Sequence, residues 1–308
     1  MNKVTNTKKT ITGPIKHCPV LVQEVLQLME IKPGETYLDV TFGGGGHARA
    51  ILEAAADVKI IGLDWDKKSL ASMTEVFTKD FGDRVKLIWG NFAHLYRLAS
   101  AHKLPKVNGI LADFGTSQHQ IFNYDGFSFA KKTPLDMRMS QSHSFYTAAD
   151  VVNTFPKERL LDIFFTLGEE PSSRIITEEI LAYRTYHKIL FADQLAEIIM
   201  KAKGGGRGKI HPATKVFQAL RMFVNREIEN IQSFLAFAPS LLAKDGRLLC
   251  ISFHSLEDRL VKDFFRTQAT NGAMTLLTKK PIMASEAEVK LNPSARSAKL
   301  RGARRQER

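Results

Sequence analysis

This 308-residue sequence is short of cysteine and of uninterrupted apolar residues. Its two cysteines, Cys18 and Cys250, cannot form a disulfide framework or a four-thiolate metal centre, and its nine histidines stand at no zinc-binding spacing. No run of about 18 apolar residues occurs, and no apolar segment follows the lysines near the start, which disfavours secretion and membrane spanning. We therefore expect a protein of the reducing cytoplasm without a resident metal ion.

Basic residues outnumber acidic ones, and they are unevenly distributed. Lys and Arg total 44 against 32 Asp and Glu, a net charge of +12. Residues 1–17, 201–215 and 290–308 together carry +15, which leaves −3 for the rest of the chain. Clusters of Lys and Arg gain affinity for phosphate backbones through counterion release, so these segments predict a nucleic-acid partner. Solvated basic tails that only keep the protein soluble are the simpler alternative.

Strand and helix patterns alternate along the first third of the chain. Hydrophobic residues make up 44% and charged residues 25%, which is ordinary for a globular protein. Short apolar segments are separated by segments with helical periodicity. The candidate strands are 37–40, 59–63, 85–89, 109–112 and 247–253. This alternation predicts an α/β fold, in which a parallel, doubly wound sheet is covered by helices on both faces.

A long interval separates the fourth and fifth candidate strands. It far exceeds the roughly 30 residues that a strand-helix-strand unit needs, and its strongest patterns are helical. We predict a mostly helical second domain inserted into the sheet domain, with 212–235 as one long helix and 204–208 as a basic, glycine-rich loop. The predicted division is a basic tail at 1–17, a sheet domain at 18–120 and 218–308, and the insert at 121–217.

Four consecutive glycines, residues 43–46, lead from the first strand into a helix. Such a turn lets the backbone approach a ligand and exposes free N–H groups, although a tight structural turn would need the same residues. Asp64 ends the second strand about 20 residues later, where an acid accepts hydrogen bonds from both ribose hydroxyls of a nucleoside cofactor. The ligand is then a nicotinamide dinucleotide or S-adenosylmethionine. Asp39 would repel a pyrophosphate and suits a sulfonium or amino group, which favours S-adenosylmethionine.

Further polar and aromatic residues follow the other candidate strands. Phe92 comes after the third strand, where core packing would explain it equally well, and Asp113 ends the fourth. A buried carboxylate is unfavourable unless it is paired, so Asp113 favours a functional role. Ser252 and His254 follow the fifth strand at the same expected edge of the sheet. A hydrolase triad there is disfavoured because no nucleophile elbow of the form G-x-S-x-G is present.

A polar stripe runs along the predicted long helix. Gln218, Arg221 and Asn225 follow Thr214 at helical spacing, beside the apolar face. Solvent exposure is the usual reason for such a stripe. Alternatively, Arg221 and Asn225 border a cleft and hold a phosphate or a base edge.

Several motifs together resemble one protein family, the bacterial 16S ribosomal RNA cytosine-N4 methyltransferases. The matching segments are HCPVLVQEVL (17–26), DVTFGGGGH (39–47), GFSF (126–129), PLDMRM (134–139), HPATKVFQALRMFVNREI (211–228), SFHSLEDR (252–259) and NPSARSAKLR (292–301). They extend over almost the whole chain. The resemblance implies a Rossmann-like methyltransferase sheet with an inserted helical domain.

The resemblance also implies the chemistry and the residues that carry it. The enzyme would use S-adenosylmethionine to methylate the exocyclic N4 of a cytidine in the decoding centre of 16S rRNA, in the small ribosomal subunit. The implied cofactor contacts are Gly45, Gly46, His47, Asp64, Phe92, Asp113 and Gln120. Asp113 is the candidate catalytic residue, and Ser252, His254, Arg221 and Asn225 are candidates for holding the base. A homodimer is compatible with the sequence. Two alternatives remain: a nucleic-acid-binding protein without catalysis, and a methyltransferase with another target.

Overall fold

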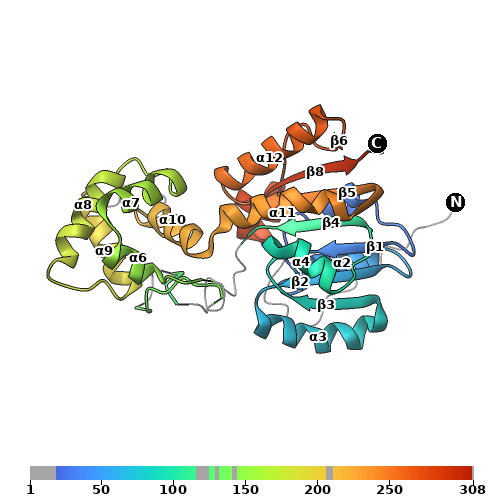
Figure 1. Ribbon diagram of the computed structural model, residues 1–308, viewed down its shortest axis with the longest axis horizontal. Helices are drawn as coiled ribbons and strands as arrows, with labels where there is room; N and C mark the ends of the chain where they lie inside the picture. The colour runs from blue at the N-terminus through green and yellow to red at the C-terminus, as the bar shows by residue number, and fades with distance from the viewer. Residues whose placement is uncertain (1–18, 116–124, 129–131, 141–143, 206–210, 307–308) are drawn as a thin grey trace.

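The computed structural model of the chain describes residues 19–115, 125–128, 132–140, 144–205 and 211–306. Figure 1 shows a sheet lobe and a smaller helical lobe beside it, joined near residue 226. The predicted basic tail 1–17, Cys18, Gln120 and most of the glycine-rich loop lie outside the described residues. In the described part of the chain, no helix is both long and apolar enough to cross a membrane.

The centre of the sheet lobe is the predicted parallel sheet. Its strands are β1 (Thr36–Asp39), β2 (Lys59–Asp64), β3 (Val85–Trp89), β4 (Val107–Asp113) and β5 (Leu242–Ser252). They pair in parallel in the order β3-β2-β1-β4-β5, so the chain reverses its direction of travel across the sheet between β1 and β4. The doubly wound α/β fold is confirmed. Open sheets of this kind bind ligands at the carboxyl ends of the strands beside such a reversal.

Helices cover both faces of this sheet. Buried side chains of α1 (Val22–Met29), α2 (Gly46–Ala54) and α3 (Lys67–Phe81) pack on one face. Buried side chains of α4 (Leu95–Ala101), α11 (Glu227–Leu241) and α12 (Ser255–Thr270) pack on the other. Short 3-10 turns, Gly82–Arg84 and Phe92–His94, precede β3 and α4. Because both faces are covered, the strands consist of nearly continuous apolar residues, which explains why they were recognisable in the sequence.

The basic segment 290–308 contains a strand of the sheet, so the alternative of a solvated basic tail is wrong for this segment. β8 (Lys299–Arg305) pairs antiparallel with β5, and β6 (Met274–Leu276) and β7 (Ile282–Met283) pair with β8. Arg301 is 8% exposed and forms a two-bonded ion pair with Asp258, with Nε–Oδ1 at 2.7 Å and Nη2–Oδ2 at 3.1 Å. This part of the basic charge is therefore neutralised inside the fold. Helix α13 (Glu286–Leu291) and the turn Pro293–Ser297 lie between β7 and β8.

The predicted boundaries of β5 also differ from the observed ones. We predicted a strand at 247–253, but β5 already begins at Leu242. Val107 of β4 pairs with Leu242, and Gly109 pairs with Arg247, so residues of β5 bulge out between these pairs. Asp245 adopts a positive φ of 57° in this bulge, which is why the sequence looks like a turn there.

The helical lobe has its own hydrophobic core. Its helices are α6 (Ala148–Thr154), α7 (Lys157–Asp162), the π-helical turn Ile163–Leu167, α8 (Ser173–Arg184), α9 (Ala192–Ala202) and α10 (Thr214–Asn225). Thr147 caps α6: its hydroxyl accepts from the Asp150 N–H, and the Asp150 carboxylate accepts from the Thr147 N–H. Buried side chains from all these helices form one cluster that is separate from the two clusters of the sheet lobe.

The predicted single helix at 212–235 is wrong, because it breaks at Arg226. This residue adopts a left-handed conformation with φ 52°, so α10 and α11 are separate helices that point in different directions (Figure 1). Leu220 and Val224 pack in the core of the helical lobe, whereas Ile231 and Phe234 pack on the sheet. We therefore propose that the insert ends after Asn225, rather than after residue 217. The apolar pattern continues across the break, so periodicity alone could not reveal it.

Candidate active site

The carboxyl edge of the parallel sheet brings together most of the predicted site residues. The glycine turn follows β1, Asp64 ends β2, Phe92 follows β3 and Asp113 ends β4. Ser252 ends β5, and Ile251 beside it is in register with Asp113. Neighbouring parallel strands present their carboxyl ends at one edge, so residues about 200 positions apart in the sequence become neighbours.

The glycine turn is closely packed against aromatic and proline side chains. Gly45 caps α2 with φ 73°, and its N–H donates to the Phe42 carbonyl at 2.7 Å. A Cβ atom on Gly45 would lie 2.3 Å from the ring of Phe77, and one on Gly46 would lie 2.7 Å from Pro19. Both positions therefore require glycine for steric reasons, and Gly45 also for its conformation.

Replacing Gly45 by Ala is expected to destabilise the protein and to abolish measurable cofactor binding. A left-handed non-glycine residue costs about 1–2 kcal/mol, and the overlap with Phe77 adds to this cost. Thermal unfolding and calorimetric titration with S-adenosylmethionine measure the two effects. Gly44→Ala is the matched control, because a Cβ there meets nothing within 4 Å. Equal behaviour of the two variants would refute the steric argument.

Asp64 is positioned to receive a ribose. It is 9% exposed; its Oδ2 accepts from the Gly43 N–H at 2.6 Å and its Oδ1 from the Asp66 N–H at 2.8 Å. Burial raises the pKa of Asp64 to about 6, although these backbone hydrogen bonds oppose the shift. Each carboxylate oxygen has a second lone pair, so both can still accept from ribose hydroxyls.

Asp39, His47 and Asp113 form a second polar group beside the turn. Asp39 is 1% exposed and accepts from the Thr41 N–H at 3.1 Å, and burial raises its pKa to about 6. The Nε2 atom of His47 lies 3.5 Å from Oδ2 of Asp113. His47 is 7% exposed, and neither ring nitrogen forms a hydrogen bond within the described residues. Buried polar atoms without partners are what a polar ligand would satisfy, and the carboxylates suit its cationic groups.

Phe92 borders this group as part of an aromatic cluster. It is partly buried, and its ring centroid lies 5.8 Å from those of Phe114 and Phe234. These contacts show that Phe92 packs in the core, and its contact with a ligand stays a prediction. The fit of S-adenosylmethionine rests on the glycine turn, the acid after β2 and the unsatisfied His47.

Ser252 and His254 lie at the same edge but point in different directions. Ser252 is 1% exposed, and its hydroxyl lies 3.4 Å from the Lys299 carbonyl of β8. His254 caps α12, because its Nδ1 accepts from the Glu257 N–H at 3.5 Å. His254 has 13% of its side chain exposed, but its Nε2 atom is buried.

Arg221 and Asn225 hold the joint between the two lobes. Arg221 forms a two-bonded ion pair with Glu227 at the start of α11, with both contacts at 2.9 Å. Asn225 is 3% exposed; its Oδ1 accepts from the Met139 N–H, and its Nδ2 donates to the carbonyls of Met137 and Arg221. These contacts are at odds with the predicted base contact, because they already use the polar atoms of the Asn225 amide.

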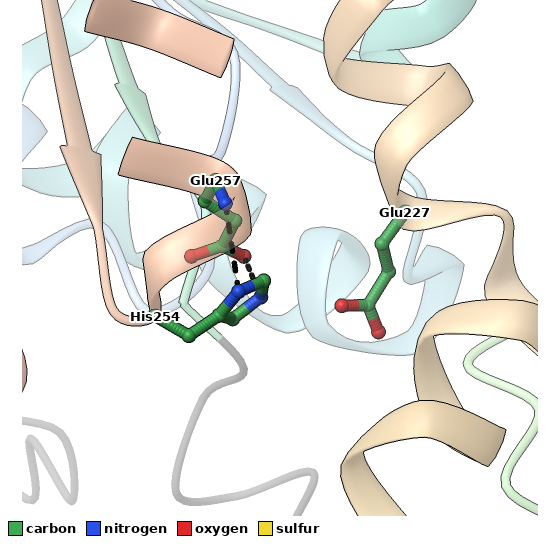
Figure 2. A group of neighbouring side chains, drawn as sticks. All are labelled: Glu227, His254 and Glu257. Atoms are coloured by element: carbon green, nitrogen blue, oxygen red, sulfur yellow. Dashed lines mark hydrogen bonds and ion pairs between the residues drawn. The ribbon is translucent and has the colours of Figure 1, made fainter. Parts of the chain in front are cut away.

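Glu227 and Glu257 are charged groups of this region that the sequence analysis did not single out. Figure 2 shows Glu227 approaching His254 from the helix opposite, while Glu257 lies on the same side as His254. One potential ligand atom of each residue lies within 4.8 Å of the others. Since the His254 Nδ1 accepts a backbone N–H, a neutral ring carries its proton on Nε2, 3.0 Å from the Glu257 carboxylate. A protonated nitrogen cannot bind a metal ion, so the geometry favours a contact of the Nε2 proton with the Glu257 carboxylate over a metal site.

The fold and the site define a class: a Rossmann-like enzyme with an adenosine-cofactor site at the sheet reversal and an inserted helical lobe. The model of the MraW methylase family matches residues 14–306, and the chain belongs to this family. It is a methyltransferase that uses S-adenosylmethionine, as the sequence predicted. Membership excludes the nicotinamide alternative and a binding protein without catalysis.

Similar proteins cover essentially the same length. Ribosomal RNA small subunit methyltransferase H of Endomicrobium trichonymphae is 46% identical, covering 93% of this chain and 98% of its own. The protein of the same name from Nostoc sp. is 44% identical, covering 98% and 97%. The solved structure of TrmN from Thermus thermophilus aligns with 92% of this chain and 48% of its own at 14% identity and a TM-score of 0.43, which is too low to support an argument.

Proposed function

We propose that this protein methylates the exocyclic N4 of a specific cytidine in the decoding centre of 16S rRNA, acting on the small ribosomal subunit in the cytoplasm. The observation that carries the proposal is the near full-length similarity, at 42–46% identity, to proteins named ribosomal RNA small subunit methyltransferase H. We assign the cofactor contacts to Gly45, Gly46, His47, Asp64, Phe92 and Asp113. Gln120, the remaining assignment, lies outside the described residues.

The bound cofactor supplies a methyl group that its sulfonium already activates. The protein must therefore align cytosine N4 with that methyl group. Such alignment supplies much of the rate enhancement in group transfers. N4 is a weak nucleophile because its lone pair is delocalised into the ring. A hydrogen-bond acceptor for the N4 hydrogens reduces this delocalisation and makes the lone pair more nucleophilic. Asp113 suits this role: its carboxylate is 14% exposed at the end of β4, and its Oδ1 accepts from the Gly115 N–H at 3.3 Å.

The reaction requires one bond to form and a proton to leave. As the N4–carbon bond forms and the sulfur–carbon bond breaks, N4 carries one proton too many. The Asp113 carboxylate can accept it and pass it to solvent. Before this step the cytidine must leave its stack, at a cost of a few kcal/mol. His254, which follows β5, is our candidate for holding the extruded base, with Ser252 behind it supporting the end of β5.

The test is transfer of labelled methyl groups to purified small subunits that lack the modification, followed by mass spectrometry of the digested rRNA. We expect N4-methylcytidine at one position in the decoding centre. Naked 16S rRNA and assembly intermediates are tested in parallel to define the stage at which the protein acts. Methylation at another position or base, or of another RNA only, would refute the proposed target while keeping the enzyme class. Sedimentation of the purified protein decides whether it is a homodimer.

A further inference from the structure

The described residues before α6, 125–128, 132–140 and 144–147, are tied to the rest of the protein by hydrogen bonds although they contain little regular structure. Met137 has a positive φ of 64°; its N–H donates to the Asp125 carbonyl at 2.9 Å, and its carbonyl accepts from Nδ2 of Asn225 at 2.8 Å. The Met139 N–H donates to Oδ1 of the same Asn225 side chain at 2.8 Å. A Cβ atom on Gly126 would lie 2.8 Å from the Asp136 nitrogen, so this glycine permits the close approach of two backbones. The motifs at 126–129, 134–139 and 211–228 thus meet in one structure.

The end of this segment is held equally well. The Ser144 side chain is buried, with its hydroxyl 3.5 Å from Oδ1 of Asn225. The Ala148 N–H donates to the Asp136 carbonyl at 2.8 Å, and Thr147 is fixed by its capping interaction with Asp150. The two residues between Ser144 and Thr147 therefore lie between firm attachments.

These two residues are aromatic and exposed. Phe145 is 92% exposed and Tyr146 is 50% exposed, with the Tyr146 ring packed edge-on against Phe155 at 5.3 Å. An exposed phenyl ring on a mobile loop needs no explanation, but here the flanking backbone hydrogen bonds hold the ring in water. Aromatic rings displayed in this way are the usual platforms for unpaired bases.

Arg138 lies on the same support. Its Nε and Nη2 donate to the Asp136 carboxylate at 2.7 and 2.8 Å, which orients the guanidinium and leaves Nη1 available. The side chain is 22% exposed. A guanidinium held in this way can direct hydrogen bonds at a phosphate, which a flexible lysine cannot do.

The segment also faces the correct part of the molecule. Asn225, which holds the segment, lies at the joint between the lobes, and its Nδ2 donates to the Arg221 carbonyl. Arg221 forms an ion pair with Glu227, and Glu227 lies near His254. In Figure 1 the green segment before α6 lies beside α6, along the helical lobe.

We propose that Phe145, Tyr146 and Arg138 form a binding surface for unpaired rRNA next to the target cytidine. Phe145 stacks on a base, Tyr146 supports it, and Arg138 donates to a phosphate of the same strand. This surface rests on the proposed function and adds to it the means by which the helical lobe recognises a single strand. Its partner is RNA with unstacked bases, not a duplex.

The first test compares Phe145→Ala with Phe145→Tyr. Loss of one stacking platform is expected to raise KM for small subunits by about 5-fold to 100-fold, with kcat, cofactor affinity and melting temperature unchanged. Phe145→Tyr retains a ring and should restore the wild-type KM. Tyr186→Ala is the matched control, because Tyr186 is another exposed aromatic residue of the helical lobe, at 82%. A Phe145→Ala protein with the wild-type KM, or one no worse than the control, would overturn the proposal.

The second test addresses the phosphate contact. Arg138→Lys keeps the charge but loses the planar fork, so we expect it to raise KM as Arg138→Ala does; wild-type behaviour of Arg138→Lys would refute the directed contact. Failure of the proposed target is recognised separately, because wild-type protein would then not methylate small subunits at all. In that event, binding of an unpaired RNA oligonucleotide by wild type and Phe145→Ala still tests the surface. Equal affinities would refute it.

Discussion

Replacing Asp113 by Ala is expected to slow methyl transfer by about 10²–10⁴-fold, the usual contribution of a positioned proton acceptor. The carboxylate lies at the end of β4, 3.5 Å from His47 and next to the glycine turn, where a base and a methyl donor would meet. The measurement is single-turnover formation of N4-methylcytidine in small subunits saturated with enzyme. This condition separates the chemical step from binding.

Two controls make the Asp113 result specific. Asp113→Asn keeps the size and one acceptor oxygen but cannot take a proton, so it should be nearly as slow as Asp113→Ala. Cofactor affinity is measured in parallel, because Asp113 is also assigned to the cofactor site. A rate within a few-fold of wild type for Asp113→Asn, with the cofactor bound, would show that proton acceptance by this residue is not needed.

Replacing Asp39 by Asn is expected to weaken the binding of S-adenosylmethionine while stabilising the free protein at pH 8. Burial raises the pKa of Asp39 from 3.8 to about 6. Because the folded pKa lies above the unfolded one, this group favours folding fully only below pH 4, and the benefit is lost as the pH rises through about 6. The neutral amide of the variant does not ionise, so the variant keeps the folding stability that the wild-type protein loses. For a pKa shift of this size, that loss is at most about 3 kcal/mol.

Denaturant unfolding at pH 4 and pH 8 tests the sign of this effect. Asp39→Asn should be more stable than wild type by about 1–3 kcal/mol at pH 8 and indistinguishable from it near pH 4, where the wild-type carboxyl is already neutral. Titration calorimetry at pH 8 should show lower affinity for the cationic cofactor. A destabilised Asp39→Asn protein at pH 8 would mean that the ionised carboxylate is satisfied by its Thr41 hydrogen bonds.

The parallel strands, and the place of the candidate cofactor residues directly after them, could be predicted because their signals are local. A strand buried on both faces is a short apolar segment, and the glycine turn and Asp64 follow their strands directly in the sequence. Asp39 and Asp113 stand out for the same reason, as carboxylates that end apolar strands. The family resemblance correctly added the reaction class and the methyl donor, which residue patterns alone left open.

The predictions that failed concern residues whose partners are distant in the sequence. Arg301 looked like part of a free basic tail until Asp258, 43 positions away, was found to pair with it. The break at Arg226 was invisible because the apolar pattern is continuous across α10 and α11. Asn225 holds a segment about 86 positions earlier in the chain, a contact that the sequence did not reveal, and its contact with the base stays a prediction.

The sequence by itself determined the alternating α/β plan, the position of the candidate cofactor residues at the ends of strands and the family of the enzyme. These depend on local periodicity and on motifs of adjacent residues, which folding does not rearrange. Only the tertiary structure decided that the helix pattern at 212–235 breaks at Arg226, that the arginines of β8 lie in the sheet, and that Glu227 lies near His254. These depend on which distant charges and apolar faces meet, because a buried charge is tolerated only where the fold supplies its partner.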